Sequence, residues 1–224
     1  MNRYHYTLTV FIVVCALWAI SGIDPVTPAN WFAESKVYFW TLPVMAAIIA
    51  YVRLSKISVT LIGVFLVLHI IGMHYNYGNV PFGTWVGHLF GSDTNVYDRV
   101  VHFSFGFLMF YPVREVLLRM KGAPGFFGYF VPLNIILSFS ALYEIMEWHT
   151  VSNLSSAVGF LFIGGNDPFD AQKDMTVALL GAVLSMIITF VAYAIRTKNV
   201  MVEIKKGLQS QRDIVTRSIY KKII

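Results

Sequence analysis

The stretch that decides the fold is NVYDRVVHFSFGFL, residues 95–108. It begins as a polar run and continues into apolar sequence, and it holds an acid, a base and an imidazole: Asp98, Arg99 and His102. Charged side chains are unfavourable inside a bilayer, so their presence at the start of an apolar segment indicates a functional task at one end of a membrane-spanning helix. The rest of the chain supports this interpretation.

The composition is typical of a membrane protein. Of the 224 residues, 57% are hydrophobic and 13% are charged, whereas about a quarter of the residues in a soluble domain are charged. The apolar residues form six blocks near the length of ~20 residues that a helix needs to cross a bilayer. These blocks are residues 5–23, 37–53, 57–75, 99–118, 126–148 and 174–195. We therefore expect an all-α polytopic bundle of six transmembrane helices, forming one domain over residues 1–195.

The placement of Lys and Arg predicts the orientation of this bundle. With a cytoplasmic N-terminus, 14 of the 17 basic residues lie on the inner side, and only Lys36, Arg99 and Lys173 lie outside. The prediction is therefore N-in and C-in. The formal charge of +5 reflects this distribution and does not indicate nucleic acid, whose binding proteins carry a basic folded face. Membrane lipids are the expected partners.

Residues 196–224 form a basic cytoplasmic tail with eight Lys or Arg residues and two acids. Four of its apolar residues have spacings compatible with one face of a helix: Ile204, Leu208, Val215 and Ile219. Such a helix would lie on the anionic headgroups of the inner leaflet. A solvated tail that follows the positive-inside rule is the alternative, and the sequence leaves both open.

Ionisable residues gather at the predicted outer ends of the helices. Nine of the twelve acids lie in outer loops or near outer helix ends. The third to sixth blocks, which run in alternating directions, bring these side chains to one depth: His69, His74, Asp98, Arg99, His102, Tyr143, Glu144, Glu147, Trp148, His149, Asp170, Lys173 and Asp174. We expect a shared polar pocket at the level of the outer lipid headgroups.

The spacing within this pocket is compatible with a metal site. Three pairs of side chains are three or four residues apart and therefore share a helix face. The pairs are Asp98 with His102, Glu144 with Glu147, and Asp170 with Asp174. Carboxylate and imidazole ligands together suit Zn, Mn or Fe, and carboxylates alone suit Mg or Ca. All six side chains are candidate ligands of a divalent metal.

A structural role for the same residues is the alternative. Asp98 and Arg99 can form an interfacial ion pair, and His102 can donate to a carboxylate and fasten two helices. His69 lies on an apolar face of its block and is expected to be a packed, hydrogen-bonded histidine. For a single residue the structural role is favoured, whereas the clustering of the whole set favours a functional pocket.

Several runs occur in the same order as in a known family: LHIIGMHYNYG, NVYDRVVHFSFGFL, YPVREVLLR, YEIMEW and the DPFDAQKDM run that leads to LLGA. Through these runs, residues 24–195 resemble the YjdF-like inner-membrane proteins. The resemblance implies a location in the bacterial inner membrane and supplies no reaction.

A more distant likeness is to the VanZ-like membrane proteins, which are associated with glycopeptide resistance. It rests on the helix start Asp98-Arg99-x-x-His102 and the helix end Tyr143-Glu144. Glu147 stands where that family has glutamine, and Ala178 stands where it has asparagine. This likeness implies work on the envelope at the outer leaflet.

Three functions fit the sequence. The first is a metal-dependent hydrolase or transferase that acts on an envelope lipid or a polyprenyl phosphate. Its expected catalytic residues are Asp98, His102, Glu144 and Glu147, and its expected substrate contacts are Asn95, Arg99, Tyr143 and Lys173. Arg99 and Lys173 would hold the phosphate. The other two are an ion-coupled transporter and a non-catalytic scaffold that binds lipid or protein.

Overall fold

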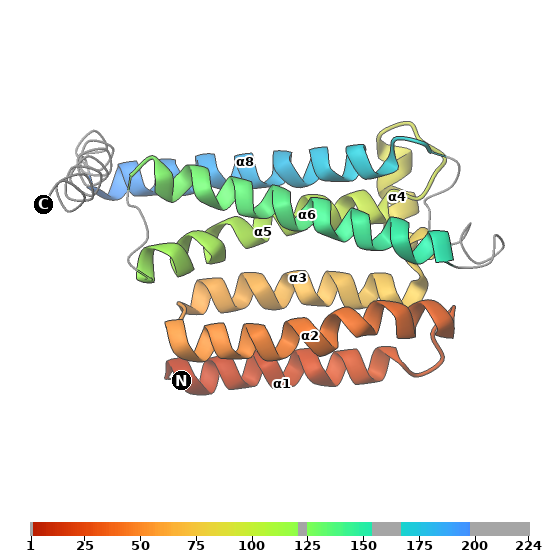
Figure 1. Ribbon diagram of the computed structural model, residues 1–224, viewed down its shortest axis with the longest axis horizontal. Helices are drawn as coiled ribbons and strands as arrows, with labels where there is room; N and C mark the ends of the chain where they lie inside the picture. Colours follow the sequence, from red (N-terminus) through yellow and green to blue (C-terminus); the bar gives the residue numbers. More distant parts are fainter. Residues whose placement is uncertain (1, 121–124, 154–166, 198–224) are drawn as a thin grey trace, which may run out of the picture.

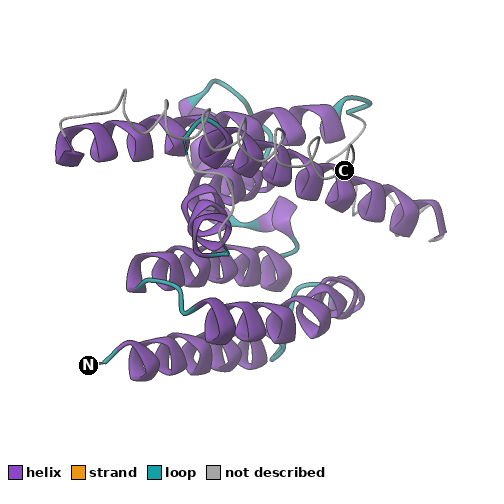
Figure 2. Cartoon of the chain, turned by 60° about the vertical axis from the view of Figure 1, so that its left-hand side comes forward, coloured by secondary structure: helices purple, strands orange, loops and turns teal. Residues whose placement is uncertain are grey.

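The computed structural model describes residues 2–120, 125–153 and 167–197 (Figure 1). All regular secondary structure in these ranges is helical (Figure 2). The elements are α1 (Arg3–Ser21), α2 (Pro28–Val52), α3 (Lys56–Tyr75), the 3₁₀ helix η1 (Tyr77–Asn79), α4 (Pro81–Leu89), α5 (Tyr97–Arg119), α6 (Phe127–Asn153) and α8 (Asp170–Thr197). The predicted all-α fold is confirmed for the described part of the chain. The predicted amphipathic helix of the tail lies outside it, since the description ends at residue 197.

Within the described residues, five helices are long and apolar enough to cross a membrane: α1, α3, α5, α6 and α8. They correspond to five of the six blocks expected from the sequence. The remaining block, residues 37–53, coincides with α2 up to Val52, but this helix begins at Pro28 and takes in much of residues 24–36, the stretch between the first two blocks. Proline is favoured at the first position of a helix, which explains the early start.

Residues 76–98, the stretch between the third and fourth apolar blocks, also contain helical structure, η1 and α4. Both contact the start of α5. Asn95 fastens this segment, because its side-chain amide donates to the carbonyl of Val80 at 2.8 Å and to Thr84 Oγ1 at 3.0 Å. Its Oδ1 accepts from the backbone N–H of Tyr97 at 2.9 Å. Asn95 therefore sets where α5 begins.

The helices form two groups that meet at α3 and α5. In one group α1, α2 and α3 lie side by side, and in the other α5, α6 and α8 pack together (Figures 1 and 2). The closest contact is between α5 and α8. A Cβ atom on Gly106 would lie 1.8 Å from the Ala178 carbonyl oxygen, and one on Gly181 would lie 2.2 Å from the Phe103 carbonyl oxygen. Small residues at a helix crossing allow this approach of the two backbones.

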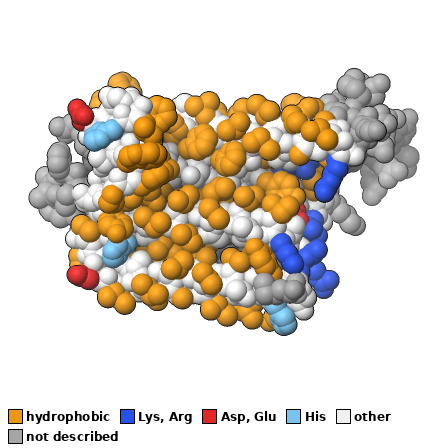
Figure 3. Space-filling model, turned by 180° about the vertical axis from the view of Figure 1, so that it is seen from behind, with side chains coloured by type: hydrophobic (Ala, Val, Ile, Leu, Met, Phe, Trp, Pro, Cys, Tyr) orange, Lys and Arg blue, Asp and Glu red, His pale blue; other side chains and the backbone are white. Residues whose placement is uncertain are grey.

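The surface between the two ends of the bundle is hydrophobic, as a lipid-facing surface requires. Ile20, Leu180 and Ile195 are all more than half exposed. Figure 3 shows hydrophobic side chains across this surface and Lys and Arg side chains gathered at one end. In Figure 1 the N-terminus and the last turns of α8 lie at the same end.

At this basic end Glu115 fastens α5 to the start of α3. Its carboxylate accepts hydrogen bonds from the backbone N–H of Ser55, from the hydroxyls of Ser55 and Ser58, and from Arg119. Carboxylates stabilise helix N-termini, where backbone N–H groups lack partners within the helix. The opposite end of the bundle holds the residues of the predicted pocket.

Candidate functional site

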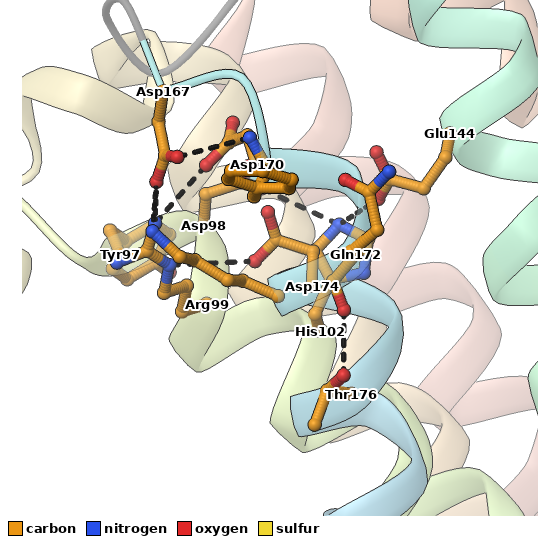
Figure 4. Close-up of polar contacts among 12 residues, drawn as sticks. Tyr97, Asp98, Arg99, His102, Glu144, Asp167, Asp170, Gln172, Asp174 and Thr176 are labelled. Carbon is orange, nitrogen blue, oxygen red and sulfur yellow. Dashed lines mark hydrogen bonds and ion pairs between the residues drawn. The ribbon is translucent and has the colours of Figure 1, made fainter.

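The site is built where α5 and α8 begin and α6 nears its end. Tyr97, which is buried at the first position of α5, donates its hydroxyl to the carbonyl of Leu68 in α3 at 2.7 Å. This hydrogen bond fixes the start of α5. Asp98, Arg99 and His102 follow on its first two turns. Figure 4 shows these side chains together with carboxylates from α6 and α8.

His102 lies at the centre of this group. Its Nε2 atom is 3.7 Å from Asp98 Oδ1 on the same helix and 3.2 Å from Glu144 Oε1 on α6. Asp174 of α8 completes the group, because Asp98, His102 and Asp174 each offer a ligand atom within 4.8 Å of the other two. Three helices thus contribute to one carboxylate–imidazole cluster, which we call the His102 cluster (Asp98, His102, Glu144 and Asp174).

Asp174 has an unusual environment for a carboxylate. Its side chain is 2% exposed, and its Oδ1 atom has no hydrogen-bond partner among the described residues. The nearest cation is Arg99, whose Nε atom lies 4.0 Å from Oδ1. A buried carboxylate oxygen without a donor is unfavourable. The His102 cluster therefore fits a bound divalent cation, which would neutralise this oxygen together with Asp98 and His102 as ligands.

The two predicted phosphate-binding cations lie beside the His102 cluster and contact a carboxylate that the sequence analysis did not assign. Arg99 Nη2 is 3.1 Å from Asp167 Oδ2 and 3.2 Å from Asp170 Oδ1. Lys173 Nζ is 2.5 Å from the same Asp167 Oδ2. The hydrogen bond from Lys173, together with one from the backbone N–H of Phe169, lowers the pKa of Asp167. Asp167 is therefore held as a carboxylate in the folded protein.

A second group of polar residues adjoins the cluster through Tyr143. The Tyr143 hydroxyl donates to Glu34 Oε2 of α2 at 3.1 Å, and the same oxygen lies 3.9 Å from His69 Nε2 of α3. The Tyr143 ring packs edge-on against both His102 and His69, with ring centroids 5.6 Å and 6.4 Å apart. Tyr143 thus lies between the His102 cluster and a pair formed by the buried His69 and the partly buried Glu34.

The structure brings most of the predicted site residues together. The His102 cluster holds four of them, Arg99, Asp170 and Lys173 lie at its edge, and Glu147 lies one turn beyond Glu144 on α6. The side chain of Asn95, a predicted substrate contact, instead forms hydrogen bonds with the α4 segment and with the backbone of Tyr97. The catalytic, substrate-binding and metal-binding roles of these residues remain predictions.

Glu34 and Asp167 belong to the site but were not predicted from the sequence. Glu34 lies between the first two apolar blocks, although Asn30, Glu34 and Tyr38 share a four-residue spacing that indicates a helix face. Asp167 precedes a proline just before a helix, a position where Asp commonly caps a turn. The helical spacing could therefore have identified Glu34, and the Asp-Pro turn before a helix could have identified Asp167.

Comparisons with known proteins support the membrane assignment. Residues 6–194 match the family described as Predicted membrane protein (DUF2238). The chain belongs to this family. It is also 28% identical over 188 residues to Inner membrane protein YjdF of Escherichia coli strain K12, a match that covers 84% of this chain and 87% of that protein. No solved structure matches the chain.

The family and the five apolar helices together confirm an integral membrane protein, and the relative confirms the resemblance to YjdF-like proteins. The location in the inner membrane is likewise confirmed.

Proposed function

We propose that the protein is a metal-dependent enzyme that acts on an envelope lipid, such as a phospholipid or a polyprenyl phosphate, at the outer face of the inner membrane. The observation that carries this proposal is Asp174 Oδ1, a buried carboxylate oxygen without a hydrogen-bond donor among the described residues. Asp174 also offers a carboxylate oxygen within 4.8 Å of ligand atoms of Asp98 and His102, across the contact between α5 and α8. Carboxylate and imidazole ligands in this arrangement suit Zn, Mn or Fe.

The proposed orientation has six crossings, with α2 as the sixth, and both termini in the cytoplasm. Two observations support it. Lys and Arg side chains gather at one end of the bundle (Figure 3). The contacts of Arg3 with the Arg53 carbonyl, and of Arg119 with Glu115, lie at the end where the chain starts. The His102 cluster lies at the other end, which then faces outward. An excess of Lys and Arg on the cytoplasmic side is the strongest determinant of orientation.

The chemistry of the site follows from this arrangement. Asp98, His102 and Asp174 would hold a divalent cation, which would polarise a phosphoryl or carbonyl oxygen of the substrate. Glu144, 3.2 Å from His102, can accept a proton from a substrate hydroxyl or from water. Glu147, one turn further along α6, is the second candidate for this role. The lipid tail would remain in the bilayer while its headgroup enters the site.

Metal content is the direct test. The protein is purified in mild detergent, and bound metal per chain is measured by elemental analysis for the wild type and for Asp174→Asn and His102→Gln. We expect near-stoichiometric metal in the wild type and at least a tenfold loss of affinity in both variants, with helicity retained by circular dichroism. Asp93→Asn, which changes an exposed acid outside the cluster, is the matched control and should bind normally.

The same measurement separates the enzyme from the scaffold that the sequence also allows. A wild type without metal, and variants that differ only in thermal stability, would contradict the proposal. In that case His102 would serve to fasten α5 to α6. If metal is present, loss of lipid turnover in Glu144→Gln with metal retained would assign the proton-transfer role.

A further inference from the structure

Two cations from different helices converge on one oxygen atom beside the His102 cluster. Arg99 of α5 and Lys173 of α8 both donate to Asp167 Oδ2, at 3.1 Å and 2.5 Å. Figure 4 shows the Arg99 guanidinium directed toward Asp167. An oxygen that accepts from a guanidinium and an ammonium together has the surroundings that proteins provide for a phosphate oxygen.

These ion pairs are more open to exchange than the side chains of His102, Glu144 and Asp174 beside them, which are at most 10% exposed. The side chains of Arg99 and Lys173 are 34% and 50% exposed, and that of Asp167 is 22% exposed. Ion pairs at this exposure are weak, because water competes for both partners. A phosphate monoester carries nearly twice the charge of a carboxylate and has three acceptor oxygens, so it would bind the same two cations more strongly.

The position of Arg99 connects this anion subsite to the proposed cation site. While Nη2 of its guanidinium faces Asp167, Nε lies 4.0 Å from Asp174 Oδ1. A phosphate bound in place of the Asp167 carboxylate would therefore lie at the edge of the His102 cluster. That is where the cation would polarise a phosphoryl oxygen.

We propose that Arg99 and Lys173 form a subsite for a phosphate monoester, and that Asp167 occupies this subsite as an internal substitute until the ligand displaces it. The inference rests on the proposed function for the placement of the phosphate against the cation. Beyond the proposed function, it specifies the ligand class, a phosphate monoester, and it identifies Asp167 as the group that competes with this ligand. The ligand is either a lipid with a terminal phosphate or a soluble phosphate, since both present the same dianion.

Asp167→Asn is the informative variant. The Asp167 Oδ1 atom accepts from the backbone N–H of Phe169 at 3.1 Å, and an asparagine side chain keeps this turn while it removes the charge. Binding of dihexanoyl phosphatidic acid and of inorganic phosphate is measured by calorimetry on the full chain in mild detergent, each with EDTA and again after loading with Mn²⁺.

We expect Asp167→Asn to bind at least one of the two phosphates about twofold to tenfold more tightly than the wild type, because two weak, competing ion pairs are lost. Lys173→Gln, a change at a half-exposed side chain, should weaken binding of the same phosphate. The control Asp93→Asn should match the wild type. Tighter binding of phosphatidic acid alone would identify a lipid headgroup, and equal tightening for both probes would identify a soluble phosphate.

Unchanged or weaker phosphate binding in Asp167→Asn, or unchanged binding in Lys173→Gln, would overturn the subsite. The two proposals fail separately. If Asp167→Asn binds phosphate more tightly than the wild type in EDTA, and the protein contains no metal, the subsite is retained and the metal centre is rejected. If the protein contains stoichiometric metal, but Asp167→Asn binds phosphate no more tightly with EDTA or with Mn²⁺, the metal centre is retained and the subsite is rejected.

Discussion

Tyr143 has two contacts that no other residue of the site combines. Its ring packs against His102 and His69, and its hydroxyl is a donor to the Glu34 carboxylate. We expect Tyr143→Phe to retain the ring packing and remove the donor. Because the Glu34 carboxylate is partly buried, the loss of its donor should lower the free energy of unfolding by about 1 kcal/mol. The melting temperature in detergent should therefore fall, and Tyr75→Phe, at a more exposed tyrosine on α3, should leave it unchanged.

Asp167 should make stability depend on pH in a defined direction. Its pKa is lowered in the folded protein by the hydrogen bonds from Lys173 and Phe169, so the folded state favours the carboxylate. The stabilisation is present above the ordinary Asp pKa of about 4 and is lost as the pH falls through the lower, folded value. The difference in melting temperature between the wild type and Asp167→Asn should therefore narrow below about pH 5. A difference that widens on acidification would contradict this assignment.

The sequence predicted those site residues whose spacing places them on one helix face. Asp98 and His102 are the clearest example, since a four-residue spacing in a helix brings two side chains together, and their atoms lie 3.7 Å apart. The sequence could not show that Asp167 would lie on Arg99, because that contact depends on how α5 packs against the start of α8. Partners far apart in the chain are set by packing rather than by local spacing.

At the scale of elements, the crossing of α5 and α8 determines the geometry of the His102 cluster. An added methyl group at Gly106 would lie 1.8 Å from the Ala178 carbonyl oxygen, and backbone atoms cannot rotate away. We expect Gly106→Ala to force the helices apart and to lower stability by about 1–3 kcal/mol, although alanine is otherwise the better helix former. Metal affinity should fall as well, because Asp174 moves away from His102.

The control for this prediction is Gly78→Ala in η1. A Cβ atom there has no neighbour within 4 Å, so neither melting temperature nor metal content should change. If both glycine variants behaved alike, the crossing would not be as close as the contact with Ala178 indicates.

Element boundaries were the weakest part of the sequence prediction. Hydropathy located the apolar blocks, but α2 begins at Pro28, nine residues before its expected block at 37, and α4 lies in an expected loop. Apolar runs mark the part of a helix that meets lipid, whereas a helix continues into the headgroup region wherever backbone hydrogen bonds and caps allow. Glu34 was missed for this reason.

At the scale of the whole molecule, the proposed orientation can be tested with single cysteines. In a Cys15→Ser background, Asp93→Cys and Met120→Cys place thiols at exposed positions at opposite ends of the bundle. We expect a membrane-impermeant maleimide to label position 93 in cells whose outer membrane has been permeabilised, and position 120 only after the inner membrane is opened. The reverse pattern would place the His102 cluster in the cytoplasm and contradict the envelope substrate.

The ion pairs of Arg99 also have a consequence for biogenesis. Its partners Asp167 and Asp170 lie 68 and 71 residues further along the chain. At 5–20 residues per second, the ribosome completes them about 4–14 s after Arg99. The α5 segment, which is less apolar than α8, is therefore synthesised before Asp167 and Asp170 exist. During that interval water, lipid headgroups and the neighbouring Asp98 are the partners open to Arg99, and its ion pairs to Asp167 and Asp170 form only once the start of α8 has arrived.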